Sequence, residues 1–150
     1  MGSKKENWEK IKQKWSEKFW SESAIFEQIH PGDKIFVGTG CGEPQYLVSA
    51  LKSYVESCPK AILDTEMVHV WTLGVAPCAE EKFKQNFRLN TFFIGNSTRS
   101  AVNKGAADYT PIFLSEVPDL FRRKVIPIDV ALIQTSLPDK HGYMLSLIHI

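Results

Sequence analysis

The segment from residue 35 to residue 55 joins a short apolar run, a glycine-rich turn and a helical pattern. The apolar run is Ile35-Phe36-Val37, and the turn that follows it reads GTGCGEPQ from Gly38 to Gln45. Pro44 suits the first position of a helix, where its missing N–H loses no hydrogen bond. Apolar residues then recur every three or four positions up to Val55, which predicts one buried helix face. A strand that runs through a tight turn into a helix is the building unit of α/β proteins.

The rest of the chain repeats this alternation of strand-like and helix-like segments. Branched and aromatic residues predict strands at residues 66–74, 91–95, 109–116 and 128–136. Helices are predicted between them at residues 79–87, 96–105 and 117–123. A proline at position 111 places the third strand at a sheet edge, and the apolar composition of the last strand predicts burial on both faces. The fold class is therefore α/β, a mostly parallel sheet flanked by helices.

The first 30 residues form a separate helical segment in this interpretation. One apolar stripe on a charged helix is predicted by residues at spacings of three and four: Trp8, Ile11, Trp15 and Phe19. A shorter helix follows, with Ser21 or Ser23 as its cap. We therefore expect residues 1–30 to dock on an α/β domain that spans residues 31–144.

Composition and charge restrict the functional classes. With 150 residues, of which 43% are hydrophobic and 23% charged, the chain has the balance of a globular protein. Its net charge of +1 lacks the basic excess typical of nucleic-acid binding, so no nucleic-acid partner is expected. No apolar run reaches the length of a membrane-spanning helix, and the first residues lack the apolar core of a signal peptide. We therefore expect a cytoplasmic protein with no membrane partner.

Cysteines and histidines form no disulfide or metal pattern. The three cysteines, Cys41, Cys58 and Cys78, are odd in number and include no C-x-x-C pair. The four histidines show neither an i,i+4 pair nor the H-E-x-x-H motif. We therefore expect reduced thiols, no metal site and no resident cofactor.

A glycine-rich turn at a helix start can hold several kinds of ligand, because free N–H groups and the helix dipole attract negative oxygens. A dinucleotide site needs G-x-G-x-x-G, but Glu43 stands at the third glycine and would face the pyrophosphate. A P-loop needs a lysine followed by serine or threonine, which the turn lacks. A carbonyl or carboxylate oxygen held by backbone amides stays compatible with this turn. So does a plain turn in which glycine only lets the chain reverse.

Three more segments carry polar side chains just after predicted strands. Residues 96–99 begin a helix, which suits either a bound carboxylate or an ordinary helix cap. Glu116 follows the edge strand, either as a pocket residue or as a surface acid in a first helical turn. Asp139 and His141 can form an acid–base pair, but a polar turn that Gly142 allows to reverse is the favoured interpretation.

Four segments occur in order between Pro31 and Tyr143: PGDKIFVGTGCGEPQYLVSAL, FRLNTFFIGNSTRSAV, GAADYTPIFLSEVPDLFRR and IPIDVALIQTSLPDKHGY. Taken together, this ordered set resembles the N-terminal domain of the acetyl-CoA hydrolase/transferase family, which includes 4-hydroxybutyrate CoA-transferase. No single motif is decisive, and the specificity lies in the order. The resemblance implies the N-terminal half of a fold with two similar α/β halves and the active site between them.

The resemblance also implies an activity. Such enzymes move coenzyme A from an acyl-CoA to a free carboxylate, through a glutamyl-CoA thioester formed on the enzyme. The glutamate belongs to the family's second half, so no residue of this chain is assigned a catalytic role. The implied substrates are an acyl-CoA and a short carboxylate, with no further cofactor. The full-length protein is expected to be a homo-oligomer.

The last residues depart from the family pattern. After Tyr143 the family continues with a serine-containing stretch into a further strand, whereas this chain has MLSLIHI. We therefore expect residues 145–150 to be foreign or frame-shifted. We also expect the catalytic half to lie outside these 150 residues and the isolated chain to be inactive.

The residues expected to shape the acyl or carboxylate end of the pocket follow predicted strands. They are Gly38, Gly40, Cys41, Gly42, Glu43, Pro44, Asn96, Ser97, Thr98, Arg99, Glu116 and Gln134. Acyl chain length stays open, as does the choice between transfer and hydrolysis, which depends on whether water reaches the thioester. Two other hypotheses stay open as well: a non-catalytic α/β module that binds a small carboxylate or nucleotide, and a subunit of a two-chain transferase.

Overall fold

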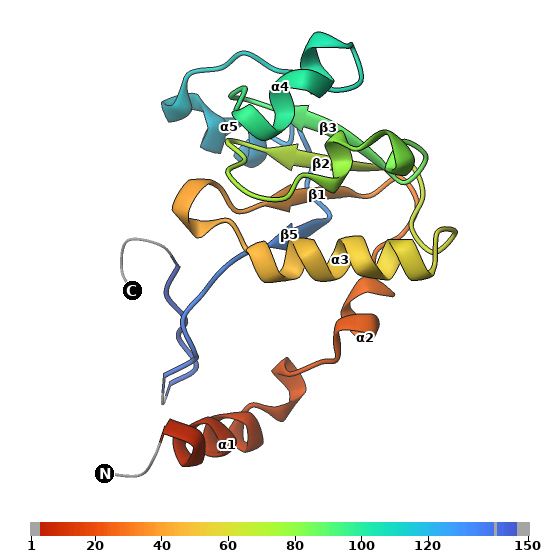
Figure 1. Ribbon diagram of the computed structural model, residues 1–150. Helices are drawn as coiled ribbons and strands as arrows, with labels where there is room; N and C mark the ends of the chain where they lie inside the picture. Colours follow the sequence, from red (N-terminus) through yellow and green to blue (C-terminus); the bar gives the residue numbers. More distant parts are fainter. Residues whose placement is uncertain (1–3, 140, 147–150) are drawn as a thin grey trace.

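The computed structural model describes residues 4–139 and 141–146, whose arrangement Figure 1 shows. Their strands are β1 (Lys34–Val37), β2 (Thr65–His69), β3 (Phe87–Thr91), β4 (Asp108–Tyr109) and β5 (Val130–Leu132). Their α-helices are α1 (Lys4–Lys14), α2 (Glu22–Phe26), α3 (Gln45–Ser57), α4 (Asn96–Asn103) and α5 (Val117–Arg122). Short 3-10 turns lie at Ser16–Lys18, Gly40–Gly42, Pro77–Ala79, Glu81–Phe83 and Leu114–Glu116.

The sheet confirms the predicted α/β class. Its strand order is β4-β3-β2-β1-β5, and every neighbouring pair is parallel. The register places Val37 beside His69, and His69 beside Thr91. The carboxyl ends of the strands therefore meet at one edge, which is where open α/β sheets bind ligands.

One face of the sheet packs against α2 and α3. In α3 the fully buried residues Val48, Leu51 and Val55 lie three and four positions apart, which confirms an amphipathic helix here. They join Ile35 from β1 and Met67 from β2 in the larger hydrophobic core. Burying a side chain of this size contributes about 1.5–3 kcal/mol, so this core holds the helix layer on the sheet.

The opposite face packs against α5. Val68 and Phe92 form a second, smaller core with Val117 of this helix. The rings of Phe36 and Phe121 meet edge to face, with their centroids 5.3 Å apart. Figure 1 shows α3 and α5 on opposite sides of the sheet. Because α5 joins β4 at one edge to β5 at the other, the chain crosses the whole sheet before it pairs with β1.

The prediction of a helix at residues 79–87 is wrong. Two 3-10 turns replace it, because Glu80 between them has an extended backbone. Asn86 then fixes the chain in an irregular path, since its side-chain amide donates to the carbonyl oxygens of Pro59 and Ile62 at 2.7 Å. These partners lie 27 and 24 residues back, so tertiary contacts override the helical pattern of this segment.

The strand predicted at residues 91–95 is displaced along the chain. β3 ends at Thr91, because its pairing with β2 begins at Phe87 and runs for five residues. The strand predicted at residues 66–74 is likewise too long, since β2 ends at His69. In both cases apolar residues continue past the paired stretch, so composition alone conceals the strand end.

The strand predicted at residues 128–136 is confirmed only at Val130–Leu132, and the expectation that it is buried on both faces is wrong. β5 lies at a sheet edge with β1 as its neighbour, and Ala131 is exposed while Leu132 is buried. The strand predicted at residues 109–116 is mostly wrong, since β4 covers only Asp108–Tyr109 and residues 114–116 form a 3-10 turn, but β4 does lie at the other edge of the sheet as expected.

The N-terminal segment is helical, but its apolar stripe is divided between two elements. α1 ends at Lys14, and a 3-10 turn at Ser16–Lys18 follows it. The predicted cap of the next helix is confirmed, because the Ser21 hydroxyl accepts a hydrogen bond from the N–H of Ala24. The Trp15 ring lies so close to Gly142 that a Cβ there would be 3.0 Å from it. The N-terminal segment therefore packs on the C-terminal turn.

That C-terminal turn confirms the favoured interpretation of Asp139 and His141. The Asp139 carboxylate accepts hydrogen bonds from the N–H groups of His141 and Tyr143, at 2.7 and 3.0 Å. Residues 147–150, most of the tail expected to be foreign, lie outside the described residues. The domain boundaries and the foreign tail stay predictions.

Candidate functional site

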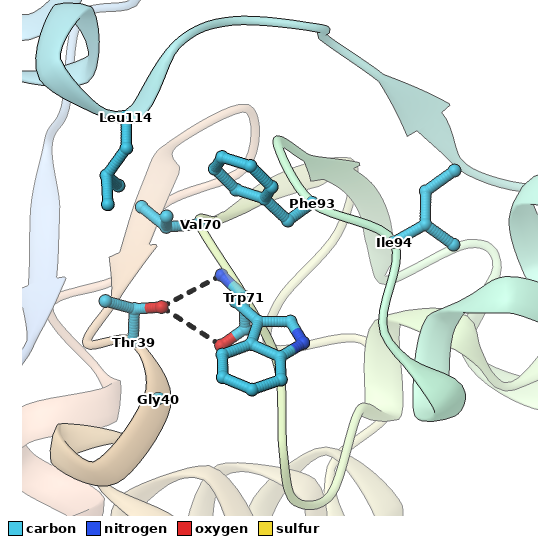
Figure 2. Close-up of a pocket in the computed structure, with 7 residues that line it drawn as sticks. All are labelled: Thr39, Gly40, Val70, Trp71, Phe93, Ile94 and Leu114. Carbon is cyan, nitrogen blue, oxygen red and sulfur yellow. Dashed lines mark hydrogen bonds between the residues drawn. The ribbon is translucent and has the colours of Figure 1, made fainter.

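A cavity of about 450 Å³ opens at the carboxyl edge of the sheet. Its lining residues come from the segments that follow β1, β2, β3 and β4, and they are Thr39, Gly40, Val70, Trp71, Phe93, Ile94 and Leu114 (Figure 2). Because the strands are parallel, the segments after them meet around the same space. The structure thus brings together the glycine-rich turn and the chain beyond three other strands.

The walls of this cavity are mainly apolar. Trp71, Phe93 and Leu114 are 47%, 38% and 63% exposed, and all three border the cavity (Figure 2). Thr39 supplies the one polar side chain in the lining formed by the described residues, and its hydroxyl group bonds the backbone of Trp71. A cavity of this composition favours an apolar group of a ligand over a charged one.

The backbone amides of the glycine-rich turn bond to neighbouring parts of the protein. Gly38 donates to the carbonyl oxygen of Leu132 at 2.9 Å, and Gly40 donates to that of Trp71 at 3.1 Å. Gly40 has a φ of +56°, a left-handed conformation that favours glycine. The turn therefore links the end of β1 to the last residue of β5 and to the chain that follows β2. Its expected role in holding a ligand oxygen stays a prediction.

The loop after β2, residues 70–74, is called the β2 loop below. Its first contact with the glycine-rich turn is made by Thr39. The Thr39 hydroxyl donates to the carbonyl oxygen of Trp71 at 3.0 Å and accepts from the Trp71 N–H at 2.9 Å (Figure 2). One side chain thereby fixes both backbone groups of the residue that forms a cavity wall.

A second contact with the β2 loop is made by Glu43. One carboxylate oxygen, Oε2, accepts hydrogen bonds from the N–H groups of Leu73 and Gly74, at 2.8 and 3.0 Å. The side chain is only 5% exposed. Its other oxygen, Oε1, is buried and has no hydrogen-bond partner among the described residues. Glu43 lies outside the cavity lining.

The predicted residues at the start of α4 also contact the β2 loop. The Ser97 hydroxyl donates to the carbonyl oxygen of Thr72 at 3.2 Å. Thr98 is buried, and its hydroxyl accepts from the N–H of Gly95 at 3.2 Å, as a helix cap does. These two side chains therefore secure the helix start and the loop.

Several predicted site residues are exposed and are not part of the cavity lining: Cys41, Asn96, Arg99, Glu116 and Gln134. Glu116 ends the 3-10 turn that supplies Leu114 to the cavity wall. Gln134 follows the end of β5 by two residues. Pro44 is the cap of α3 and not its first residue, since its carbonyl oxygen accepts the N–H of Val48. Their roles toward a ligand stay predictions.

A buried polar cluster lies beside the β2 loop. His69 Nδ1 is 2.5 Å from the Thr72 hydroxyl, and His69 Nε2 is 3.9 Å from Cys78 Sγ. Burial lowers the pKa of His69 to about 4. Burial, with a smaller effect of the Glu43 charge, raises the pKa of Cys78 to about 12. Both groups are therefore neutral at pH 7, and Cys78 carries no thiolate that could act as a nucleophile.

The described residues contain neither a cluster suited to a metal ion nor a helix suited to span a membrane. No group of three or more His, Cys, Asp or Glu side chains in residues 4–139 and 141–146 is placed to hold a metal ion. None of the helices in that same part is long and apolar enough to cross a bilayer. The expectation of no resident cofactor stays a prediction.

Sequence reasoning missed most of the residues that form the cavity. Val70 and Trp71 were assigned to a strand, and so were Phe93 and Ile94, whereas all four follow a strand end. One available signal was a tryptophan three residues before Gly74 at the end of an apolar run. Turn glycines mark strand ends, and a large aromatic side chain there lies beside the ligand edge of the sheet.

Comparisons with known proteins agree with this architecture. Residues 2–148 match the family profile of the acetyl-CoA hydrolase/transferase N-terminal domain. The chain is 40% identical over 136 residues to 4-hydroxybutyrate coenzyme A transferase of Clostridium kluyveri, covering 91% of this chain and 30% of that protein. It is 41% identical over 118 residues to succinyl-CoA:acetate/propanoyl-CoA:succinate CoA transferase of Fasciola hepatica, covering 79% and 24%.

A solved structure has the same fold. RipA from Yersinia pestis matches with a TM-score of 0.74 over 89% of this chain and 32% of that chain, at 20% sequence identity. Identity at this level bears on the fold alone. The chain spans 30% and 24% of the lengths of the two curated relatives named above. By the family profile and these relatives, the chain belongs to the acetyl-CoA hydrolase/transferase family and represents its N-terminal domain.

Proposed function

We propose that this chain is the N-terminal part of an enzyme that transfers coenzyme A between an acyl-CoA and a small carboxylate. Membership of the family and the names of the CoA-transferase relatives support this activity. The observation that carries it on this chain is the apolar cavity of about 450 Å³ at the carboxyl edge of the sheet. An acyl group is the apolar part of such a substrate, and this cavity suits it.

In the proposed reaction an enzyme glutamate attacks the thioester carbonyl carbon, and the C–S bond breaks to give a mixed anhydride and CoA thiolate. The thiolate then attacks the glutamyl carbonyl carbon, which releases the first acid as its carboxylate and leaves a glutamyl-CoA thioester. A second carboxylate reverses these two steps and departs as its CoA ester. We place this glutamate outside the present 150 residues, in the second half of the family's fold.

The contribution proposed for this chain is binding and exclusion of water. Walls formed by Trp71, Phe93 and Leu114 would hold the acyl chain, and together with the second half of the enzyme they would keep solvent from the reacting carbonyl group. Water that reached a thioester or glutamyl intermediate would hydrolyse it, so a dry wall favours transfer over hydrolysis. We propose transfer for this reason.

Further properties are proposed on the same family basis. The acyl group is short, of the acetyl or 4-hydroxybutyryl type, which is consistent with the named relatives. The substrates are small molecules, no resident cofactor is needed, and the full-length protein is a cytoplasmic homo-oligomer. The isolated 150-residue chain is inactive, because it lacks the nucleophile.

A CoA-exchange assay tests the proposal. The full-length gene product is incubated with acetyl-CoA and isotope-labelled butyrate, and labelled butyryl-CoA is measured by mass spectrometry. Labelled butyryl-CoA supports a transferase, whereas release of free CoA thiol without it indicates a hydrolase. If neither product forms and the intact protein mass shows no CoA adduct, the result would contradict catalysis and favour a binding module.

A further inference from the structure

We propose that Glu43 is a positioning residue that sets the shape of the cavity by holding the β2 loop, and that it does not contact the substrate. The contacts of the loop carry the structural part of this inference. Its consequence for acyl selection rests on the proposed function. Glu43 stands in the glycine-rich turn where a ligand contact was predicted, so the inference assigns the turn a different task.

Among the described residues, the side-chain hydrogen bonds of Glu43 are all made with the β2 loop. Its Oε2 atom accepts the N–H groups of Leu73 and Gly74, at 2.8 and 3.0 Å. Bonds from backbone N–H groups to a carboxylate are about twice as strong as bonds between neutral groups. Two consecutive amides are therefore held by one oxygen atom that belongs to the neighbouring turn.

The burial of Glu43 argues against a direct role in binding substrate. The residue is 5% exposed, and its Oε1 atom is buried without a partner among the described residues. The cavity lining does not include it. An unsatisfied buried polar atom costs about 1–3 kcal/mol. A carboxylate that bears this cost and does not line the cavity is best explained by its bonds to the loop.

The position of these bonds explains how Glu43 acts on the cavity. Leu73 and Gly74 follow Trp71, the residue whose indole forms a cavity wall. Thr39 holds the backbone of Trp71 itself, so the turn secures the loop at both ends. Releasing the Glu43 end would leave the loop held at the Trp71 backbone by Thr39 and Gly40 and at Thr72 by Ser97 and His69, with Leu73 and Gly74 no longer held by a side chain of the turn.

The surroundings of Trp71 make the wall sensitive to such a change. A Cβ at Gly95 would lie 3.1 Å from the indole nitrogen and 2.8 Å from the carbonyl oxygen of Thr72. The loop is thus packed closely against the start of α4. Close-packed interiors transmit small displacements, so a shift at Leu73 would change the space beside the indole.

Three variants separate the geometry of Glu43 from its charge. Glu43→Gln keeps the length and can place its amide oxygen where Oε2 accepts both bonds. Glu43→Asp keeps the charge but is shorter by one carbon, so it cannot reach both amides. Glu43→Ala removes both properties. Glu66→Gln is the matched control, since Glu66 is also largely buried but bonds Lys34 and Asn90 elsewhere on the sheet.

Amide hydrogen exchange of the β2 loop in the full-length gene product is the first measurement. We expect exchange at Leu73 and Gly74 to accelerate on the order of tenfold or more in Glu43→Asp and Glu43→Ala. In Glu43→Gln, where neutral bonds replace charge-assisted ones, exchange should accelerate less than in Glu43→Asp, and in Glu66→Gln it should stay within a few-fold of the unaltered protein. If Glu43→Ala does not fold, Glu43→Asp carries the test. Unchanged exchange in Glu43→Asp, or an effect confined to Glu43→Gln, would overturn the inference.

Acyl preference is the second measurement. The ratio of kcat/KM for butyryl-CoA over acetyl-CoA should change several-fold in Glu43→Asp and stay the same in Glu43→Gln and Glu66→Gln. A uniform fall in kcat with an unchanged ratio would overturn the link to the cavity. If the unaltered protein transfers no CoA but exchange still accelerates in Glu43→Asp, the positioning role stands and the proposed function fails.

Discussion

The Thr39 hydroxyl group is bonded to both backbone groups of Trp71, accepting its N–H at 2.9 Å and donating to its carbonyl oxygen at 3.0 Å. Thr39 follows β1 and Trp71 follows β2, so these bonds cross the carboxyl edge of the sheet between neighbouring strands. The residue in the glycine-rich turn that touches the cavity through a side chain therefore also fixes the opposite wall (Figure 2).

Thr39→Val should weaken this connection without changing side-chain volume. The N–H of Trp71 loses its acceptor, and we expect the free energy of unfolding to fall by about 1–2 kcal/mol, measured by urea denaturation. Thr39→Ser keeps the hydroxyl group and should restore most of the loss. Equal stability of the valine and serine variants would show that the two bonds contribute nothing.

Trp71→Ala should change acyl selection, because it removes one wall of the cavity. In the full-length protein we expect kcat/KM to shift toward longer acyl-CoA substrates by roughly tenfold relative to acetyl-CoA, the order of one methylene in an apolar pocket. Trp20→Ala is the control, since Trp20 is similarly exposed, at 57% against 47%, and lies outside this cavity. The same shift in both variants would contradict a specific role for Trp71.

The alternation of strands and helices was predictable because it depends on local properties. Branched residues in Ile35-Phe36-Val37 and the period of the α3 residues report strand and helix directly, and β1 and α3 lie where they were expected. Resemblance to the family was equally available, since it depends on order along the chain. The segments that surround the cavity were also predictable from the order of the strands, because the carboxyl ends of parallel strands lie together.

The strand ends and the side-chain roles were not predictable in this way. Phe93 and Trp71 are as apolar as the strand residues before them, so only the pairing of β2 with β3 reveals that they lie beyond the sheet. Glu43 was predicted to contact a ligand because its actual partners could not be seen in the sequence. It accepts hydrogen bonds from the N–H groups of residues 73 and 74, which are 30 and 31 positions away. Contacts at that sequence separation leave no local pattern.

Gly95→Ala tests how tightly the β2 loop packs on α4. Gly95 has a φ of −89°, so alanine meets no backbone strain. Its Cβ, however, would lie 2.8 Å from the carbonyl oxygen of Thr72. Overpacking of this kind destabilises by about 1–3 kcal/mol, which urea denaturation would detect.

Gly74→Ala is the matched variant for Gly95→Ala. Its Cβ would overlap the side chain of Gln45, but that side chain is exposed and can rotate away. We therefore expect a change in unfolding free energy of less than about 1 kcal/mol. A larger loss for Gly74→Ala than for Gly95→Ala would contradict the packing described for the loop.

The three cysteines should differ in reactivity. Cys41 and Cys58 are exposed, whereas Cys78 is buried and burial raises its pKa to about 12. A thiol reagent such as Ellman's reagent should therefore modify two thiols in the folded protein and the third only after denaturation. Cys78→Ser should leave the count in the folded protein unchanged, while Cys41→Ser should lower it by one. Rapid modification of Cys78 in the folded protein would contradict its burial.

Stability should fall with acid because His69 is buried in its neutral form. Burial lowers its pKa from the usual 6.5 to about 4. At a pH between about 4 and 6.5, the His69 imidazole binds a proton in the unfolded chain but stays neutral in the folded protein. This contribution to stability is therefore complete above pH 6.5 and is lost as pH falls toward 4. A difference of this size corresponds to about 3 kcal/mol.

His69→Asn isolates that contribution, because asparagine can still bond Thr72 but does not titrate. Between pH 7 and pH 4 its free energy of unfolding should fall by about 3 kcal/mol less than that of the unaltered chain, whatever its stability at pH 7. Parallel curves for His69→Asn and the unaltered chain would mean that the buried imidazole accepts its proton without unfolding the protein.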